Sequence, residues 1–203
     1  MTSSIQTPAG IVNLALGKLG HPRRVGNLYD GSEEAKAALD FYGQTRDNML
    51  RDETWEFSKR QAAPTLLKQA PANGYVGVVW NPAYPPLPWF FEYGYPADCL
   101  RVWSVRPPPL QIPNFDPQHY VFGIENDNSL NPAQKVICCN VASAVVTYAG
   151  RVTDPTTWEP DFVEALAAAM ARRLGRFAAS PDMFKLAVAD EPASAQAGLS
   201  VRG

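Results

Sequence analysis

Apolar residues recur at helical spacing near the start of the chain. Val12, Ala15, Leu16 and Leu19 share one face of a helix that we predict to begin at Thr7-Pro8 and to end at Gly20. A threonine cap accepts hydrogen bonds from free amides, and a proline at the first helical position loses no donor. A glycine is a common residue just after a helix, so both boundaries agree with the pattern.

A second helix is predicted from about Ser32 to about Asp52, with either Asp30 or Ser32 as its cap. Its apolar stripe consists of Ala35, Ala38, Leu39, Tyr42 and Met49. Trp55 and Phe57 follow at a spacing of two, which is compatible with a turn or with a short strand. The periodicity does not choose between these two structures.

A strong helical pattern returns in the last third of the chain. A helix that opens at Pro160 carries the apolar stripe Val163, Leu166, Met170, Leu174 and Phe177. Its other face is almost entirely alanine, which allows close approach of a second backbone, so we expect packing on more than one side. A final helix is predicted from Ser180-Pro181 to about Ala195.

Alternating patterns between these helices predict strands. Two are expected before residue 110, at Trp89–Tyr95 and Leu100–Val105, with a turn at Pro96-Ala97-Asp98 between them. Two more are expected at His119–Gly123 and Lys135–Cys139, joined by the turn-rich segment Glu125–Ser129. The span from Val141 to Val152 fits a strand or a helix.

These elements predict an α+β fold, a helical bundle with a β-rich, antiparallel insertion. The expected parts are N-terminal helices over residues 1–63, a proline- and aromatic-rich β insertion over residues 64–140, and C-terminal helices with a tail over residues 141–203. The helical parts are expected to form one bundle.

Composition narrows the class of protein. The chain has 203 residues, a formal net charge of -2, 46% hydrophobic residues and 19% charged residues, so it can bury a core and is not a disordered tail. No apolar run is long enough for a transmembrane helix, and the first residues lack the pattern of a secretion signal. Cys99, Cys138 and Cys139 do not make a disulfide framework, so we expect a reduced protein made inside a cell.

Local catalytic motifs are missing from the sequence. There is no glycine-rich phosphate loop and no Gly-x-Ser-x-Gly elbow, and only two histidines are present. We therefore expect no catalytic residue, no cofactor and no metal site. The alternative is a small hydrolase, which would use a carboxylate pair drawn from Glu33, Asp52, Asp98 and Asp154.

The middle of the chain is unusual in composition. Of 19 prolines, 12 lie between Pro64 and Pro117, and 12 aromatic residues lie between Tyr75 and Phe122. This segment can fold as a loop over its own core, or it can form a surface that another subunit or protein covers, and the excess of aromatics favours the interface. The predicted contacts with a neighbouring subunit or another protein are Trp80, Tyr84, Trp89, Phe90 and Phe91.

Three arginines, Arg172, Arg173 and Arg176, cluster late in the alanine-rich helix. Cations at this position complement the helix dipole, which is the simpler interpretation. They can also contact phosphates or an acidic protein face, so a DNA-binding module is a third hypothesis. The net charge of -2 argues against tight, sequence-independent DNA binding.

Several segments together resemble the head-to-tail adaptor proteins of tailed bacteriophages, the group that includes the tail tubular protein A type and the head-completion proteins. The segments are Ile11–Gly20, Glu34–Tyr42, Arg46–Leu50, Trp55–Phe57, Tyr95–Val102, Arg151–Trp158 and Pro160–Ala171. Their joint order and spacing carry the resemblance, which extends over roughly residues 8 to 190.

The resemblance implies structural work. Such adaptors form a ring, typically of twelve copies, between the portal protein and the tail nozzle, and DNA passes through the bore. It implies a virion protein of the phage neck, made in the host cytoplasm, that contacts passing DNA transiently and no membrane. The segment from Ser180 to Gly203 would reach the portal, and the predicted portal-facing or channel contacts are Arg172, Arg173, Arg176, Phe184 and Lys185.

Overall fold

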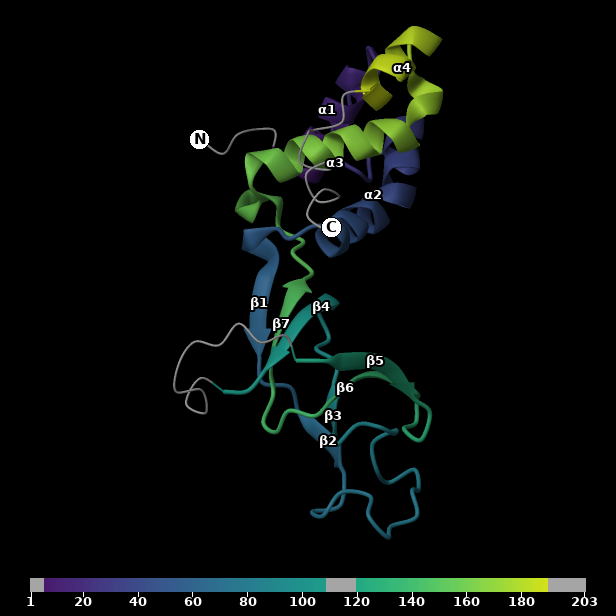
Figure 1. Cartoon of the computed structure of the whole chain (residues 1–203). Helices are drawn as coiled ribbons and strands as arrows, with labels where there is room; N and C mark the ends of the chain where they lie inside the picture. Colours follow the sequence, from purple (N-terminus) through teal and green to yellow (C-terminus); the bar gives the residue numbers. More distant parts are fainter. Residues whose placement is uncertain (1–5, 109–119, 190–203) are drawn as a thin grey trace. The chain divides into compact units, whose positions relative to one another are not determined.

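The computed structural model describes residues 6–108 and 120–189 and has an α+β fold (Figure 1). This part of the chain contains four α-helices and two antiparallel sheets, so the predicted α+β class is confirmed. It divides into two compact units. The helical unit combines the two ends of the chain, up to Ser58 and from Arg151, and the β unit runs from Lys59 to Gly150.

The first two helices begin at the predicted caps. In α1 (Pro8–Lys18), Thr7 Oγ1 accepts a hydrogen bond from the Gly10 amide at 3.0 Å. In α2 (Glu33–Asp52), Ser32 Oγ accepts one from the Ala35 amide at 3.2 Å. Gly20 ends the first helical segment with a φ of 69°, in the left-handed region that glycine adopts without strain.

Helix α3 (Pro160–Arg173) is the centre of the helical unit, because it packs against α1, α2 and α4 (Pro181–Ala189). Phe162, Leu166 and Met170 are fully buried, and so is most of the alanine face: Ala165, Ala167, Ala168 and Ala171. The expectation that this helix packs on more than one side is confirmed. The predicted end of the last helix, near Ala195, lies outside the described residues.

The segment after α2 is a 3-10 helix, η1 (Glu56–Ser58), followed directly by strand β1 (Lys59–Ala62). The ring of Phe162 lies 5.0 Å from Trp55, 5.1 Å from Phe57 and 5.0 Å from Trp158 between ring centroids. These edge-on contacts join the end of α2 to α3. Two further 3-10 helices flank α3, η3 (Pro155–Thr157) before it and η4 (Gly175–Phe177) after it.

Two sheets make up the β unit (Figure 1). The three-stranded sheet has the order β1-β7-β4, with β4 at Cys99–Arg106 and β7 at Val145–Gly150. The four-stranded sheet has the order β2-β3-β6-β5. Its strands are β2 (Leu66–Gln69), β3 (Phe91–Gly94), β6 (Gln134–Cys139) and β5 (Phe122–Asp127).

The two sheets share one apolar core. Tyr93, Ile137 and Cys139 from the four-stranded sheet pack with Val102, Val105, Val146 and Tyr148 from the three-stranded sheet. Because side chains alternate along a strand, Glu92 and Cys138 point to the opposite, outer face of the four-stranded sheet. The adjacent Cys138 and Cys139 are both buried and point to opposite faces of this sheet.

Several expectations need correction. Strands β1 and β2 were not predicted, and the span from Val141 to Val152, which fitted a strand or a helix, contains strand β7 but was grouped with the C-terminal helices. The β unit is therefore longer than the expected insertion of residues 64–140. The strand expected at His119–Gly123 begins at Phe122 and continues through the expected turn to Asp127, while His119 lies outside the described residues.

Two further corrections concern packing. Leu39 was placed on the buried stripe of α2 but is 43% exposed, whereas Leu50 is fully buried. Strands β3 and β4, consecutive in the chain, belong to different sheets and do not pair with each other. The turn at Pro96–Asp98 thus carries the chain from one sheet to the other.

Candidate interaction surfaces

The loop between β2 and β3, residues 70–90, contains no Asp, Glu, Lys or Arg and is held by aromatic side chains that bond its own backbone. Tyr75 Oη donates to the carbonyl of Pro85 at 3.0 Å, and Trp80 Nε1 donates to the same carbonyl at 2.8 Å. The Tyr75 ring also meets the Tyr84 ring edge-on, with centroids 6.1 Å apart. We call this segment the β2–β3 loop.

The five predicted contact aromatics separate into three groups. Trp80 and Phe90 are 42% and 39% exposed, so both offer surface to another chain. Tyr84 and Trp89 are half-buried, and Trp89 Nε1 donates to Glu125 Oε1 at 2.8 Å. Phe91 is partly buried and packs against the core between the sheets, because it sits on the inner face of β3.

The most exposed apolar side chains of the loop are aliphatic. Val76 is 86% exposed, Val79 88% and Leu87 59%. We call these three residues the apolar tip. Only the aromatic residues of this loop were predicted as contacts, and the apolar tip was missed. The absence of charged residues between Lys68 and Glu92 is the sequence feature that indicates it.

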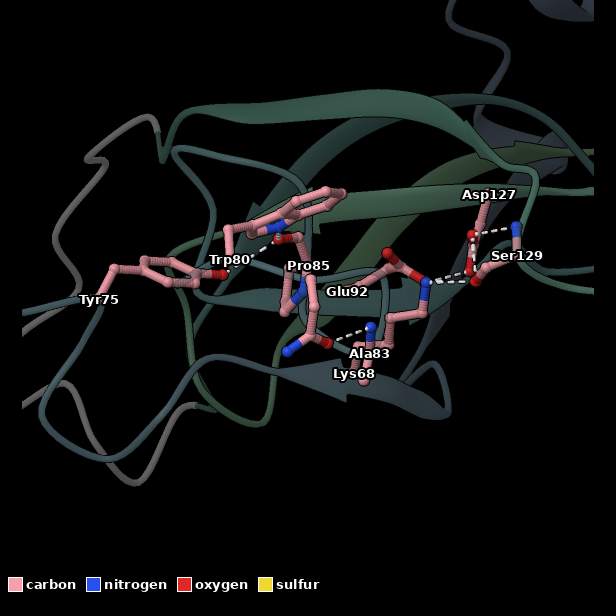
Figure 2. A network of polar contacts seen from close by, with 9 residues as sticks. Lys68, Tyr75, Trp80, Ala83, Pro85, Glu92, Asp127 and Ser129 are labelled. Carbon is pink, nitrogen blue, oxygen red and sulfur yellow. Dashed lines mark hydrogen bonds and ion pairs between the residues drawn. The ribbon is translucent and has the colours of Figure 1, made fainter. Parts of the chain in front are cut away.

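A polar cluster lies on the outer face of the four-stranded sheet (Figure 2). Lys68 Nζ is 2.5 Å from Asp127 Oδ2, 2.8 Å from Ser129 Oγ and 3.6 Å from Glu92 Oε1. Asp127 Oδ1 also accepts hydrogen bonds from the amide and the hydroxyl of Ser129, at 2.9 and 2.7 Å. The ammonium group of Lys68 thus lies between Glu92 and the Asp127–Ser129 turn.

The two carboxyl groups of this cluster titrate very differently. Burial raises the pKa of Glu92 from 4.5 to about 7 and outweighs the attraction of Lys68. Although burial works in the opposite direction, hydrogen bonds from Lys68 and Ser129 lower the pKa of Asp127 from 3.8 to about 2. Near neutral pH Asp127 is therefore ionised, and Glu92 is close to half protonated.

Neither Glu92 nor Asp127 was singled out from the sequence. Glu92 stands between Phe91 and Tyr93, which pack in the core. An acidic residue in an otherwise apolar strand is a weak indication of a polar site on the outer face of the sheet. Asp127 resembles an ordinary turn residue. Pairing across four strands brings the two together, and no local pattern contains that information.

The predicted portal-facing residues lie at the end of α3 and on α4. Arg172, Arg173 and Arg176 are all exposed. The guanidinium of Arg173 lies 5.9 Å from the Phe41 ring centroid and that of Arg176 4.8 Å from Phe177. Lys185 Nζ is 3.5 Å from Asp182 Oδ1, an exposed pair one helical turn apart.

Helix α4 also presents apolar side chains. Phe184 is 37% exposed, Leu186 65% and Val188 37%. Phe184 and Val188 lie one turn apart on one side of the helix, and Leu186 points to the opposite side. We use the name α4 face for these three exposed residues together. It lies in the helical unit, whereas the apolar tip lies in the β unit, so the chain carries two unlike apolar surfaces.

The four carboxylates proposed for a hydrolase have different local environments, and Glu33 and Asp52 lie far apart. Glu33 and Asp52 occupy the first and last positions of the 20-residue helix α2, about 28 Å apart at 1.5 Å per residue. Asp98 belongs to the β unit, where it pairs with Arg60 and accepts a hydrogen bond from Tyr148 Oη at 3.1 Å. Asp154 caps η3, since its Oδ1 accepts from the Thr156 amide at 3.0 Å.

Among the described residues, no three His, Cys, Asp or Glu side chains are arranged to hold a metal ion. Burial raises the pKa of the Cys99, Cys138 and Cys139 thiols, and it raises that of Cys138 to about 12. These thiols are therefore protonated near neutral pH and weakly nucleophilic.

Within residues 6–108 and 120–189, no helix has both the length and the apolar character needed to cross a membrane. No protein-family model matches this chain, and no curated protein is similar to it.

Proposed function

We propose that this chain is a structural subunit of the neck of a tailed bacteriophage: a head-to-tail adaptor that assembles as a ring between the portal and the tail and forms part of the DNA channel. The resemblance of its ordered segments to such adaptors motivates the proposal. The fold is compatible with it, because a β unit is inserted between two helical segments that pack together as one unit.

The observation that carries the proposal is the exposure of the apolar tip. Val76 and Val79 leave more than four-fifths of their surface open although no charged residue lies within the loop around them. The internal hydrogen bonds of Tyr75 and Trp80 shape the loop so that it holds these valines outward. Clustered exposed apolar side chains on an ordered loop mark contacts with other proteins.

A ring requires two different surfaces on each subunit, because each interface joins one face of a copy to another face of the next. The apolar tip and the α4 face are two such surfaces, and they differ in shape and composition. The net charge of -2 also suits a DNA conduit, since a strongly basic bore would hold the genome through its phosphates.

The direct test mixes the purified chain with its portal and tail nozzle proteins and follows assembly by sedimentation velocity and electron microscopy. We expect a ring of this chain seated on the portal. The double variant V76S/V79S should lower the assembled fraction at least tenfold. The control V121S, which changes a 75% exposed valine of the same unit outside the loop, should assemble normally.

A chain that stays monomeric and never binds the portal would overturn the proposal. Equal assembly of V76S/V79S and V121S would overturn the role of the apolar tip.

A further inference from the structure

A cavity of about 390 Å³ lies between the β2–β3 loop and the outer face of the four-stranded sheet. One wall carries the loop residues Trp80, Pro82, Tyr84 and Pro86, and the other carries acidic and amide side chains and Lys68. Its volume falls in the range of sites that receive a small ligand or one large side chain. It contains the polar cluster of Figure 2.

The charges that line this cavity do not balance. Glu92, Glu125 and Asp127 contribute three carboxyl groups, and Lys68 is the single cation among the described lining residues. Lys68 is engaged with the Asp127–Ser129 turn, because its Nζ is 2.5 Å from Asp127 Oδ2 and 2.8 Å from Ser129 Oγ. It stands 3.6 Å from Glu92 Oε1, which is beyond a hydrogen bond.

Glu92 is the least satisfied group of the cluster. Its side chain is 1% exposed, and neither Oε1 nor Oε2 accepts a hydrogen bond from the described residues. A buried carboxyl group without a donor is unfavourable, and few native structures retain one without a functional reason. A guanidinium or ammonium group that entered the cavity would supply both the donors and the charge.

The opposite wall suits the rest of such a side chain. Aromatic rings attract cations through their π faces, and prolines give an apolar surface for methylene groups. Trp80 is 42% exposed, so part of its indole remains accessible at the rim of the cavity. The cavity therefore combines an acidic wall with an aromatic wall, as sites for basic side chains do.

We propose that this cavity is a binding site for an arginine or lysine side chain of a partner protein, which enters between Trp80 and Tyr84 and binds the carboxyl group of Glu92. The binding chemistry rests on the cavity alone. The identity of the partner as an assembly protein rests on the proposed adaptor function.

The proposal predicts a dependence on pH. The charged or titratable groups around Glu92 and its cavity are Lys68 from β2, Tyr84 from the β2–β3 loop, Glu125 and Asp127 from β5, and Cys138 from β6. Asp127, with a pKa of about 2, and Cys138, with a pKa of about 12, keep their protonation states between pH 6 and pH 8. Glu92, with a pKa of about 7, ionises in this interval. A cation binds the ionised form, so binding should tighten about tenfold from pH 6 to pH 8.

The experiment uses the full chain and the peptide acetyl-Gly-Arg-Gly-amide, with acetyl-Gly-Gln-Gly-amide as the uncharged control. Binding is followed by NMR through the indole N–H signals. Trp80 and Trp89 lie beside the cavity, while Trp55 and Trp158 belong to the helical unit and serve as internal references. We expect saturable shifts of the Trp80 and Trp89 signals with the arginine peptide only, at about tenfold lower concentration at pH 8 than at pH 6.

The variant E92Q should bind the arginine peptide at least tenfold more weakly at pH 8 and should lose the pH dependence. The control E33Q, which neutralises an exposed carboxylate of α2, should behave as the unmodified chain. Absence of saturable shifts, equal binding of both peptides, or equal binding at pH 6 and pH 8 would each overturn the proposal. The pH comparison needs no variant, so it holds even where E92Q does not fold.

These results can be separated from the test of the adaptor function. If the chain binds the peptide but never binds the portal, the proposed binding site stands and the adaptor function is overturned. If the chain assembles on the portal but does not bind the peptide, the adaptor function stands and the proposed binding site is overturned.

Discussion

At the scale of single residues, stability depends at two positions on backbone conformation and on the burial of a titratable group. Gly20 and Glu92 show the two cases. Gly20 holds a left-handed backbone at the end of the first helical segment, and Glu92 carries a carboxyl group with no exposed surface. Each leads to a prediction about stability.

Gly20→Ala should destabilise the chain by about 1 kcal/mol or more, because alanine resists the positive φ. The new Cβ would also lie 3.2 Å from Met183 Cε and 3.3 Å from Ala179 Cβ, which is tight. Gly43→Ala is the matched control. It places a Cβ with nothing within 4 Å in the interior of α2 and should stabilise by about 0.5–1 kcal/mol. Urea denaturation of both variants measures the difference, and shifts of the same sign would contradict this account.

Glu92 should make the chain less stable as the pH rises. Between the unfolded pKa of 4.5 and the folded pKa of about 7, the folded state holds a proton that the unfolded state has released. The free energy of unfolding should therefore fall through this interval, by up to about 3 kcal/mol at pH 8. Asp127 has the opposite shift, and its contribution is lost only below about pH 4.

Glu92→Gln should abolish that decline, because glutamine does not ionise. Urea denaturation at pH 5 and pH 8 measures it, with E33Q as a control that retains the decline. A parallel loss of stability in E92Q would show that another group is responsible.

Elements of the helical unit depend on close approach to α3. Three helices contact α3, and its alanine face is buried, so larger side chains have no room there. The alanine face already indicated in the sequence that this helix packs on more than one side. Only the structure shows which helices contact α3.

Ala167→Leu should cost about 1–3 kcal/mol, because Ala167 is fully buried and a larger side chain would force its neighbours apart. Ala169→Leu is the control on the same helix. Ala169 lines an open groove of about 420 Å³ with Met49 and Arg173, so leucine there should change stability by less than about 0.5 kcal/mol. Thermal unfolding followed by circular dichroism compares the two, and equal losses would contradict the expected difference in space.

At the scale of the whole molecule, two units carry two exposed apolar surfaces, and the proposed function needs both. The apolar tip and the α4 face can be altered separately, because each involves side chains that contribute little to its own unit's core. Assembly and folding can thus be measured independently.

Leu186→Ser should leave the unfolding temperature nearly unchanged, since Leu186 is 65% exposed, and should weaken portal binding at least tenfold. Leu39→Ser, at a 43% exposed leucine of α2, is the control and should bind the portal normally. Pull-down of the chain by the portal measures both. Normal binding by L186S would remove Leu186 from the portal contact.

The sequence by itself determined the helices and the fold class. Caps and periodic stripes act over a few residues, so Thr7, Ser32, Gly20 and Pro160 define helix ends locally. Four of the strands were also predicted within a few residues, because their apolar alternation is a local property. Strands β1 and β2 were missed because each has only four residues, is largely exposed and lies at a sheet edge, so pairing and not a local pattern defines it.

Only the tertiary structure decided which residues meet. The pairing of β3 with β6 and of β6 with β5 brings Glu92 and Asp127 to one ammonium group, and it places the ring of Phe91 against the sheet core. The valines of the apolar tip are exposed because aromatic hydrogen bonds close the loop behind them. Contacts between distant residues depend on strand register and on burial in three dimensions, and a linear pattern of residue types does not encode either one.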